Sequence, residues 1–137
     1  MLLSRQEYIE NILDHHDQPR NRRRIEGADI EASGGNPGCG DIVRIYAKLD
    51  PEGRIVDAAF EGEGCTISQA GASMLTEDLL GKTPDEVTNL SFETVMEEMG
   101  RDVVASRTRC ATLALSTAKA AAADYVSSKR FEAAAQL

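Results

Sequence analysis

The 137-residue sequence predicts an α+β fold, in one domain that spans residues 1–137. Two observations predict this fold. Apolar and polar residues alternate over 41–49 and 54–61, and the turn between these segments contains Pro51 and Gly53, as in an antiparallel hairpin. Beyond the hairpin, apolar residues instead recur at helical spacing. Strands followed by helices, without regular alternation, are typical of the α+β class.

The chain ahead of the hairpin is expected to begin with a helix over residues 3–15, which Pro19 ends. The apolar residues that lie at helical spacing are Leu3, Tyr8, Ile9, Ile12 and Leu13. The basic run Arg20–Arg24 follows, either as a solvated loop or as a docking patch for an acidic partner. The glycine-rich stretch after it allows at most a short strand around 28–32.

One face of each hairpin strand is expected to be buried, with Val43, Ile45, Ala47 and Leu49 in the first strand and Val56, Ala58 and Phe60 in the second. A helix is expected to begin near Cys65 and to end at Gly81. Short helices over 84–88 and 91–99 follow, and a long helix runs from about Ser106 to Val126. The helical residues expected to face the core are Ile67, Ala70, Met74, Leu75, Leu79, Met96, Met99, Leu113, Ala114, Ala118, Ala121 and Tyr125.

Lys and Arg number 15 against 23 Asp and Glu, which gives a formal net charge of −8. This balance argues against binding to nucleic acid or to an anionic membrane surface, because both require basic protein surface. No stretch approaches the roughly 18 apolar residues of a membrane span. Acidic residues also interrupt the N-terminal helix where a signal peptide would be apolar. The sequence therefore predicts a cytoplasmic protein.

Three cysteines, Cys39, Cys65 and Cys110, are the strongest candidates for chemistry. An odd number of cysteines in a chain with no recognisable export signal argues against a disulfide framework. No two of them form a C-x-x-C pair, which excludes a zinc ribbon or a thioredoxin motif. We therefore expect the thiols to be free, catalytic or metal-bound.

The local sequence around each cysteine favours a function. Cys39 lies in a glycine-rich loop, Cys65 opens a helix, and Cys110 lies in the first turns of the last helix behind two arginines. A helix N-terminus and nearby arginine favour the thiolate, which binds metals and attacks sulfane sulfur. With Asp41, three thiolates would complete a four-coordinate site for Zn²⁺ or an iron–sulfur cluster. Alternatively, each cysteine is a small buried hydrophobic residue, and Asp41 caps a turn or a strand end.

His15 and His16 lie near the end of the first expected helix, where the helix dipole favours histidine. A partner contact or a metal ligand is the alternative role for either of them. No phosphate-binding loop or serine nucleophile elbow is found, and neither histidine has a relation to a cysteine that would indicate a cysteine protease.

Four motifs resemble those of the IscU, SufU and N-terminal NifU iron–sulfur scaffold proteins. They are the segments Asp14–Asn21, Asn36–Asp41, Gly62–Glu77 and Arg107–Leu113. They follow one another in the family's order and extend the resemblance over about residues 5–126. The resemblance implies an α+β domain in which a three-stranded antiparallel sheet packs against helices.

The resemblance also implies a site and a function. Cys39, Asp41, Cys65 and Cys110 would hold the metal or cluster, and the three cysteines would be the candidates for accepting a persulfide. A cysteine desulfurase of the IscS/SufS type would supply the sulfur, and a [2Fe-2S] cluster would be assembled and passed to apo-proteins. The protein would be a scaffold and not an enzyme, acting as a monomer or as a homo-oligomer bridged by the cluster.

Two departures from the IscU pattern leave a second function open, because the histidine before the last cysteine is replaced and residues 103–107 replace the Leu-Pro-Pro-Val-Lys stretch of IscU. Arg109 occupies the position of a histidine before the last cysteine, and a basic residue there, like Arg107, is similar to SufU. The separation of Cys65 from Cys110 resembles IscU instead. Without the histidine, one oxygen donor joins three thiolates, which predicts a labile cluster. The same ligands suit Zn²⁺, so the alternative is a zinc-dependent, SufU-like sulfurtransferase that accepts persulfide from the desulfurase.

Overall fold

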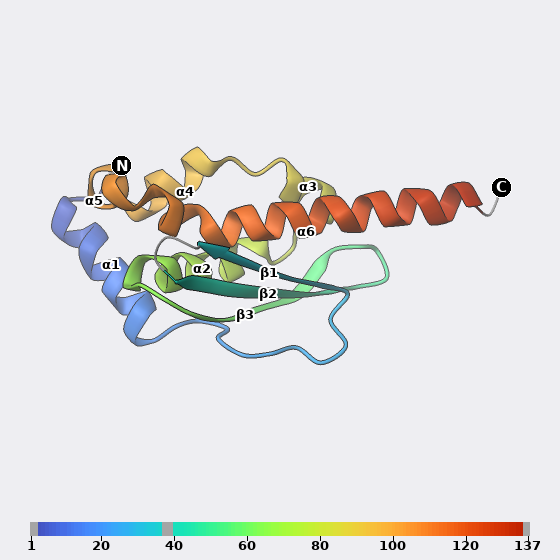
Figure 1. Cartoon of the computed structure of the whole chain (residues 1–137), viewed down its shortest axis with the longest axis horizontal. Helices are drawn as coiled ribbons and strands as arrows, with labels where there is room; N and C mark the ends of the chain where they lie inside the picture. The colour runs from blue at the N-terminus through green and yellow to red at the C-terminus, as the bar shows by residue number, and fades with distance from the viewer. Residues whose placement is uncertain (1–2, 37–39, 136–137) are drawn as a thin grey trace.

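The computed structural model describes residues 3–36 and 40–135, and Figure 1 shows one sheet with helices packed on it. Helix α1 (Arg5–Asp17) precedes the strands β1 (Ile30–Asn36), β2 (Asp41–Leu49) and β3 (Ile55–Glu63). The elements that follow are α2 (Thr66–Leu79), α3 (Pro84–Thr88), α4 (Phe92–Met99), α5 (Arg101–Val104), a 3₁₀ turn (Ala105–Arg107) and α6 (Thr108–Ala135). The predicted α+β fold with a three-stranded antiparallel sheet is confirmed.

The strand order is β1-β2-β3, and the register brings three chain segments to one end of the sheet. Asn36 lies opposite Asp41, and Ile42 lies opposite Glu63. The end of β1, the start of β2 and the end of β3 are therefore neighbours. Helices α2 and α6 pack on one face of the sheet, and the main hydrophobic core lies between these two layers. Its most deeply buried strand residues are Val43, Ile45, Ala58 and Phe60.

The opposite face of the sheet is partly covered by the segment between α1 and β1. Ile25 and Ala28 pack on Tyr46 and Ala59, so Tyr46 is fully buried although it points away from the helices. The Tyr46 hydroxyl donates a hydrogen bond to Glu61 at the edge of this covered region. Burial of this side chain raises its pKa above the ordinary value of 10.

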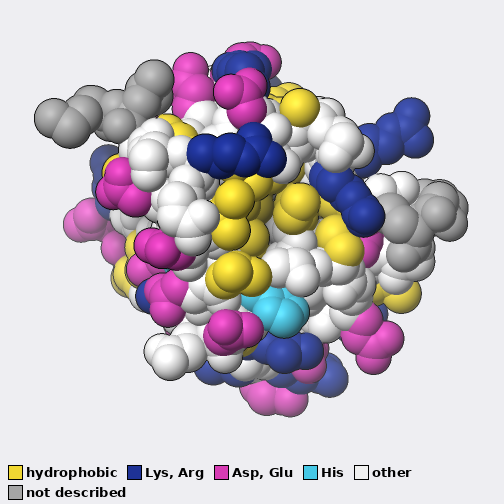
Figure 2. All heavy atoms as spheres, turned by 90° about the vertical axis from the view of Figure 1, so that its left-hand side faces the viewer, with side chains coloured by type: hydrophobic (Ala, Val, Ile, Leu, Met, Phe, Trp, Pro, Cys, Tyr) yellow, Lys and Arg dark blue, Asp and Glu magenta, His cyan; other side chains and the backbone are white. Residues whose placement is uncertain are grey.

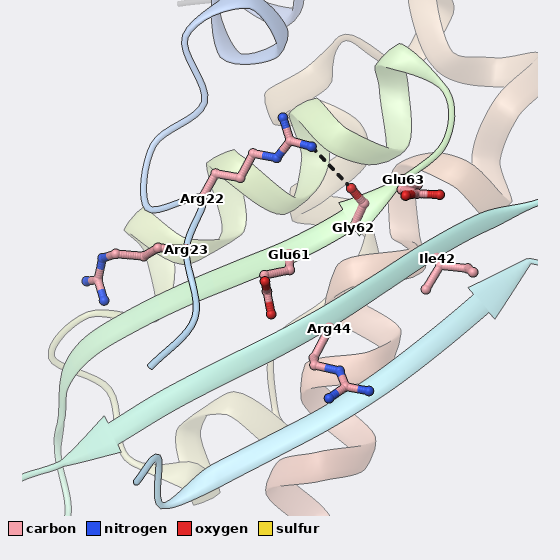
Figure 3. A pocket seen from close by; sticks show the side chains of 7 residues that line it. All are labelled: Arg22, Arg23, Ile42, Arg44, Glu61, Gly62 and Glu63. Atoms are coloured by element: carbon pink, nitrogen blue, oxygen red, sulfur yellow. Dashed lines mark hydrogen bonds between the residues drawn. The ribbon is translucent and has the colours of Figure 1, made fainter. Parts of the chain in front are cut away.

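The basic run Arg20–Arg24 lies along the edge of β3, where Arg22 forms a parallel bridge with Phe60. Its ion pairs join Arg20 to Asp14, Arg23 to Asp57, and Arg24 to Glu26. Arg22 donates to the carbonyl oxygen of Gly62 at 3.4 Å, as Figure 3 shows, beside a surface hollow of about 580 Å³. The run therefore fastens the covering segment to the sheet, and exposed ion pairs of this kind add little stability each.

Strand β1 is longer than the sequence suggests and continues through Ser33, Gly34 and Gly35 to Asn36. The reason is the close approach of α6 at Gly34. A Cβ atom placed on Gly34 would lie 2.0 Å from Thr117 Oγ1 on that helix. Glycine is thus required by packing at a position that a propensity argument assigns to a loop.

Val56 was expected to face the core, and this expectation is wrong because its side chain is 56% exposed. The register between β2 and β3 shifts at the end of the hairpin, where Leu49 pairs with Ile55 directly after Lys48 pairs with Asp57. This irregularity turns Ile55 inward, and it is 3% exposed. Ala58 and Phe60 remain buried as expected.

The helices largely follow the expected ranges. A capping box at Ser4 begins α1, and the Cys65 side chain caps α2. Helix α2 ends at Leu79, before Gly81, and α6 continues to Ala135, well past the expected end, so its last part extends beyond the sheet (Figure 1). The expected core residues Met74, Met96 and Met99 are buried. Over the residues with an assigned structure, no helix is long and apolar enough to cross a membrane.

His15 connects α1 to α2 and is 7% exposed. Its Nδ1 lies 2.8 Å from Ser73 Oγ, and its Nε2 lies 3.7 Å from Glu77 Oε1. Because Ser73 Oγ already accepts the Arg20 N–H at 2.8 Å, the serine proton is available for Nδ1. This arrangement suits a neutral imidazole that carries its proton on Nε2.

We expect His15 to make the fold sensitive to acid. Burial lowers its pKa below the ordinary value of 6.5. The stability that the neutral ring contributes is therefore present above pH 6.5 and is lost as the pH falls through the folded-state pKa. His15→Asn keeps a hydrogen-bond acceptor but cannot become positively charged. The urea unfolding midpoint of this variant should therefore fall less than that of the wild type as the pH is lowered. The exposed His16→Asn is the control, and equal pH slopes in wild type and His15→Asn would contradict the assignment.

Candidate metal centre

Three of the four residues expected to bind metal meet at the end of the sheet. Asp41 begins β2, Cys65 caps the N-terminus of α2, and Cys110 is the third residue of α6. One ligand atom from each lies within 4.8 Å of the others. The meeting point follows from the topology, because β3 leads directly into α2 and the start of α6 packs across the same end.

Asp41 is 1% exposed and lies between the two cysteines. Its Oδ1 accepts the backbone N–H of Cys65 at 2.7 Å. Its Oδ2 lies 3.0 Å from Cys110 Sγ and 3.8 Å from Cys65 Sγ, so both thiols point at one carboxylate oxygen. Buried carboxylates are costly without such partners, and these contacts compensate for the loss of hydration.

Cys65 is half-buried, and its sulfur takes the place of the usual capping oxygen of α2. Sγ accepts the backbone N–H of Ser68 at 3.4 Å. The unpaired N–H groups and the dipole of a helix N-terminus favour negative charge at this point. The sharp entry into the helix uses Gly64, whose φ is +144°. A Cβ on Gly64 would lie 2.2 Å from Asp41 Oδ1, so glycine alone lets the carboxylate approach.

Cys110 is 3% exposed and therefore far less accessible than Cys65. Besides Asp41, its sulfur has the side-chain amide of Asn36 at 3.9 Å. Asn36, Arg107 and Arg109 line a surface hollow of about 360 Å³ next to Cys110. Both arginine side chains are exposed at its rim.

The remaining candidates from the sequence are placed differently. Cys39 falls in residues 37–39, outside the described residues, so its part in the site stays a prediction. His15 Nδ1 is hydrogen-bonded to Ser73 Oγ, and His16 Nδ1 lies 3.2 Å from Asp17 Oδ1. Within the described ranges, the three-residue group above is the cluster that meets the geometry of a metal site, and neither histidine belongs to it.

The chemistry of this donor set fits a metal or cluster. Two thiols and one carboxylate, with one ligand atom each within 4.8 Å of the others, could supply three of the four ligands of a tetrahedral Zn²⁺. The same three side chains could also bind the iron atoms of an iron–sulfur cluster. Sulfur ligands select for soft or borderline metals, and the carboxylate is the weakest match among them. Residues 3–36 and 40–135 therefore contain a preformed but incomplete ligand set.

Burial predicts the order in which the two described thiols react in the metal-free protein. Cys65 should be alkylated several times faster than Cys110, because Cys65 is half-buried whereas Cys110 is 3% exposed and contacts Asp41 and Asn36. Iodoacetamide labelling followed by peptide mass spectrometry measures both rates in one sample. Unfolding in urea is the control and should equalise them; equal rates in the folded protein would contradict the burial of Cys110.

Comparison with known proteins identifies the family. A family model described as "NifU-like N terminal domain" matches residues 7–132. The chain belongs to this family. The NifU-like chain is 34% identical over 125 residues to the iron-sulfur cluster assembly scaffold protein IscU of Escherichia coli K12, covering 89% of this chain and 96% of that protein. It is also 36% identical to the iron-sulfur cluster assembly enzyme IscU of Drosophila melanogaster, covering 86% and 77% of the two chains.

Solved structures agree with this membership. A putative iron-sulfur cluster assembly scaffold protein for the SUF system from Fervidobacterium islandicum AW-1 matches with a TM-score of 0.69 at 30% identity. That match covers 88% of the NifU-like chain and 99% of the other. A nitrogen-fixing NifU-like protein (N-terminal) from Brucella abortus matches with a TM-score of 0.71 over 92% of this chain and 99% of that chain, and its 20% identity supports the fold alone.

Sequence reasoning missed three supporting contacts in this NifU-like chain. These are the Cys65 N–H bond to Asp41, the Ser68 N–H bond to Cys65, and the Asn36 amide near Cys110. A glycine directly before a helix-opening cysteine is a sequence signal for the first contact. The third joins residues 74 positions apart and has no local signal.

Proposed function

We propose that this protein is an iron–sulfur cluster assembly scaffold. It accepts sulfur from a cysteine desulfurase, assembles a [2Fe-2S] cluster on Cys39, Asp41, Cys65 and Cys110, and transfers the cluster to apo-proteins. The observation that supports this most directly is the convergence of Asp41, Cys65 and Cys110 within 4.8 Å. Named scaffold relatives of nearly the same length add to that support. We further propose that residues 1–137 work as one domain and not as an enzyme.

The carboxylate gives the scaffold a means of release. A hard oxygen donor binds a cluster iron less firmly than a thiolate does. Asp41 also has an alternative partner in the Cys65 N–H, at 2.7 Å. When the cluster leaves, the carboxylate can return to this hydrogen bond, which lowers the cost of breaking its bond to iron.

Asp41→Ala should therefore lengthen the lifetime of the bound cluster. The variant removes the weak oxygen ligand and its hydrogen bond to the Cys65 N–H, so loss of the cluster to an apo-ferredoxin should slow several-fold. Absorbance during anaerobic transfer measures the rate. Asp57→Ala removes a carboxylate that pairs with Arg23 on the sheet surface and is the matched control. A transfer rate in Asp41→Ala equal to that of the control would rule out Asp41 as the release element.

Partners of the scaffold would meet the end of the molecule that holds the metal centre. Figure 2 views this end, and hydrophobic side chains gather near its centre with basic and acidic side chains around them. An apolar centre with a charged rim is typical of a protein interface. We assign this surface to the cysteine desulfurase and to the apo-protein acceptors. The working state is a monomer, or a homo-oligomer bridged by the cluster.

A zinc-dependent sulfurtransferase is the second candidate function. Arg109 beside Cys110 and the similarity to a SUF-system protein favour it. In this case Zn²⁺ would occupy the same ligands, and a cysteine of the desulfurase would exchange for one of them to deliver persulfide. The two functions use the same residues and differ in the cargo.

Anaerobic reconstitution with ferrous iron, cysteine and a cysteine desulfurase separates the two functions. A chromophore with matched iron and sulfide that moves to an apo-ferredoxin is expected for the scaffold. Tightly held zinc, no chromophore and faster desulfurase turnover would establish the sulfurtransferase instead. Replacing Cys39, Cys65 or Cys110 singly by serine should abolish whichever of the two activities the protein has. Full activity in one of these variants would show that the replaced cysteine is not part of the site.

A further inference from the structure

Asn36 is a neighbour of two residues of the candidate metal centre, Asp41 and Cys110, although none of the functions above assigns it a role. It is the last residue of β1 and lies opposite Asp41 in the sheet register. Its backbone oxygen accepts the N–H of Gly40 at 3.0 Å, which ties together the two residues that flank 37–39. Its side-chain Nδ2 lies 3.9 Å from Cys110 Sγ.

The distance between Asn36 and Cys110 is held by the packing of β1 on α6. Gly34 allows this contact because Thr117 Oγ1 occupies the space of its missing Cβ. Thr117 lies two helical turns after Cys110, and Gly34 lies two residues before Asn36. The close approach at Gly34 therefore fixes the strand end beside the helix start, and the Asn36 amide has little freedom to leave the sulfur.

We propose that Asn36 is a positioning residue of the metal centre, which donates its amide N–H to the Cys110 sulfur when that sulfur binds metal; this inference rests on the proposed function. A thiol is a weak hydrogen-bond acceptor, and the contact between Asn36 Nδ2 and Cys110 Sγ is long, at 3.9 Å. Metal binding converts the thiol to a thiolate, and hydrogen bonds to charged acceptors are shorter and about twice as strong.

The bond has a defined electronic effect. A donor to a metal-bound sulfur draws negative charge from it, so the sulfur gives up electron density to the metal less readily. Hydrogen bonds to ligating sulfurs are among the factors that set the reduction potential of iron–sulfur clusters. Groups that orient a ligand from outside the coordination sphere typically contribute about 10–100-fold to metal affinity. Asn36 should therefore raise the reduction potential of the cluster, and by holding Cys110 Sγ in place it should also raise the affinity for metal.

Titration with Co²⁺ tests this without cluster assembly, because sulfur-to-cobalt charge-transfer absorption reports directly on the ligating sulfurs. Asn36→Leu has a similar size and no donor. We expect its charge-transfer band to move to longer wavelength and its Co²⁺ affinity to fall about 10-fold. Asn36→Gln retains an amide donor and should recover part of the wavelength shift. Thr108 lines the same hollow, and its hydroxyl donates to the Ala105 carbonyl oxygen at 3.1 Å, so Thr108→Val is the control, with no expected shift.

The outcomes separate this inference from the proposed function. A band at the same wavelength in wild type and Asn36→Leu would overturn the role of Asn36, even if affinity or stability fell. A wild-type protein that shows no charge-transfer band at all would overturn the metal centre itself. For the reconstituted cluster, a lower reduction potential in Asn36→Leu than in Thr108→Val supports the inference, and equal potentials contradict it.

Discussion

Replacement of Gly64 by alanine is expected to abolish tight metal binding while the fold is retained. The new Cβ would lie 2.2 Å from Asp41 Oδ1 and 2.9 Å from Asp41 Cα, so the carboxylate has to move. Movement breaks its bond to the Cys65 N–H, and the strained backbone at residue 64 also displaces the Cys65 thiol, which Asp41→Ala leaves in place. The φ of +144° adds backbone strain for any residue with a side chain. We expect Co²⁺ or Zn²⁺ affinity to fall at least roughly 100-fold, or about 2.7 kcal/mol.

Gly53→Ala is the matched control for this prediction. Gly53 also has a positive φ, of +86°, but nothing lies within 4 Å of its Cβ position in the hairpin turn. It should show the cost of backbone strain alone, about 1 kcal/mol of unfolding free energy, with unchanged metal affinity. Metal titrations and urea unfolding of both variants separate the two effects. A Gly64→Ala affinity within a few-fold of wild type would show that Asp41 does not need its observed position.

Gly34→Ala is expected to destabilise the whole protein. Its Cβ would lie 2.0 Å from Thr117 Oγ1 and 3.2 Å from Thr117 Cβ, on a helix that cannot shift without disturbing the main core. Overpacking of this kind typically costs about 1–3 kcal/mol, and the short distance places this case at the upper end. Urea unfolding should therefore show a clearly lower midpoint with an unchanged slope.

Two further variants make the Gly34 prediction specific. Gly35→Ala adds the same methyl group one residue later, where the nearest atom is 3.5 Å away, so stability should be nearly unchanged. Thr117→Ala removes the clashing oxygen, and the double variant Gly34→Ala/Thr117→Ala should be more stable than Gly34→Ala alone. Two results would show that the clash with Thr117 is not the cause. One is a Gly35→Ala variant that is destabilised as much as Gly34→Ala, and the other is a double variant that is less stable than either single variant.

The sequence predicted those features that depend on local pattern. Strand β2 has the expected bounds, because apolar residues occupy alternate positions from Val43 to Leu49 and a Pro- and Gly-containing turn follows. The expected helix start at Cys65 and the place of Cys110 in the first turn of α6 also agree with the structure. These placements allowed a metal site to be expected, although spacing alone left buried cysteines as an equal alternative.

Features that depend on contacts between distant segments could not be predicted. Strand β1 runs through two glycines because α6 packs on them, and no residue within the strand signals this. Val56 is turned outward by a register shift that depends on both strands of the hairpin. The bonds of Asp41 to Cys65 and of Asn36 to Cys110 join residues 24 and 74 positions apart. The participation of Cys39 remains a prediction.

The convergence of Asp41, Cys65 and Cys110 also links metal occupancy to global folding. The three residues lie on three different elements and are brought together only by long-range packing. An unfolded chain offers no comparable ligand set, so by mass action each tenfold increase of metal above its dissociation constant should add about 1.4 kcal/mol to the unfolding free energy. A loaded molecule should therefore resist proteolysis and heat better than an empty one. The thermal midpoint would then report metal occupancy, and a cell's proteases would preferentially remove molecules that hold no metal.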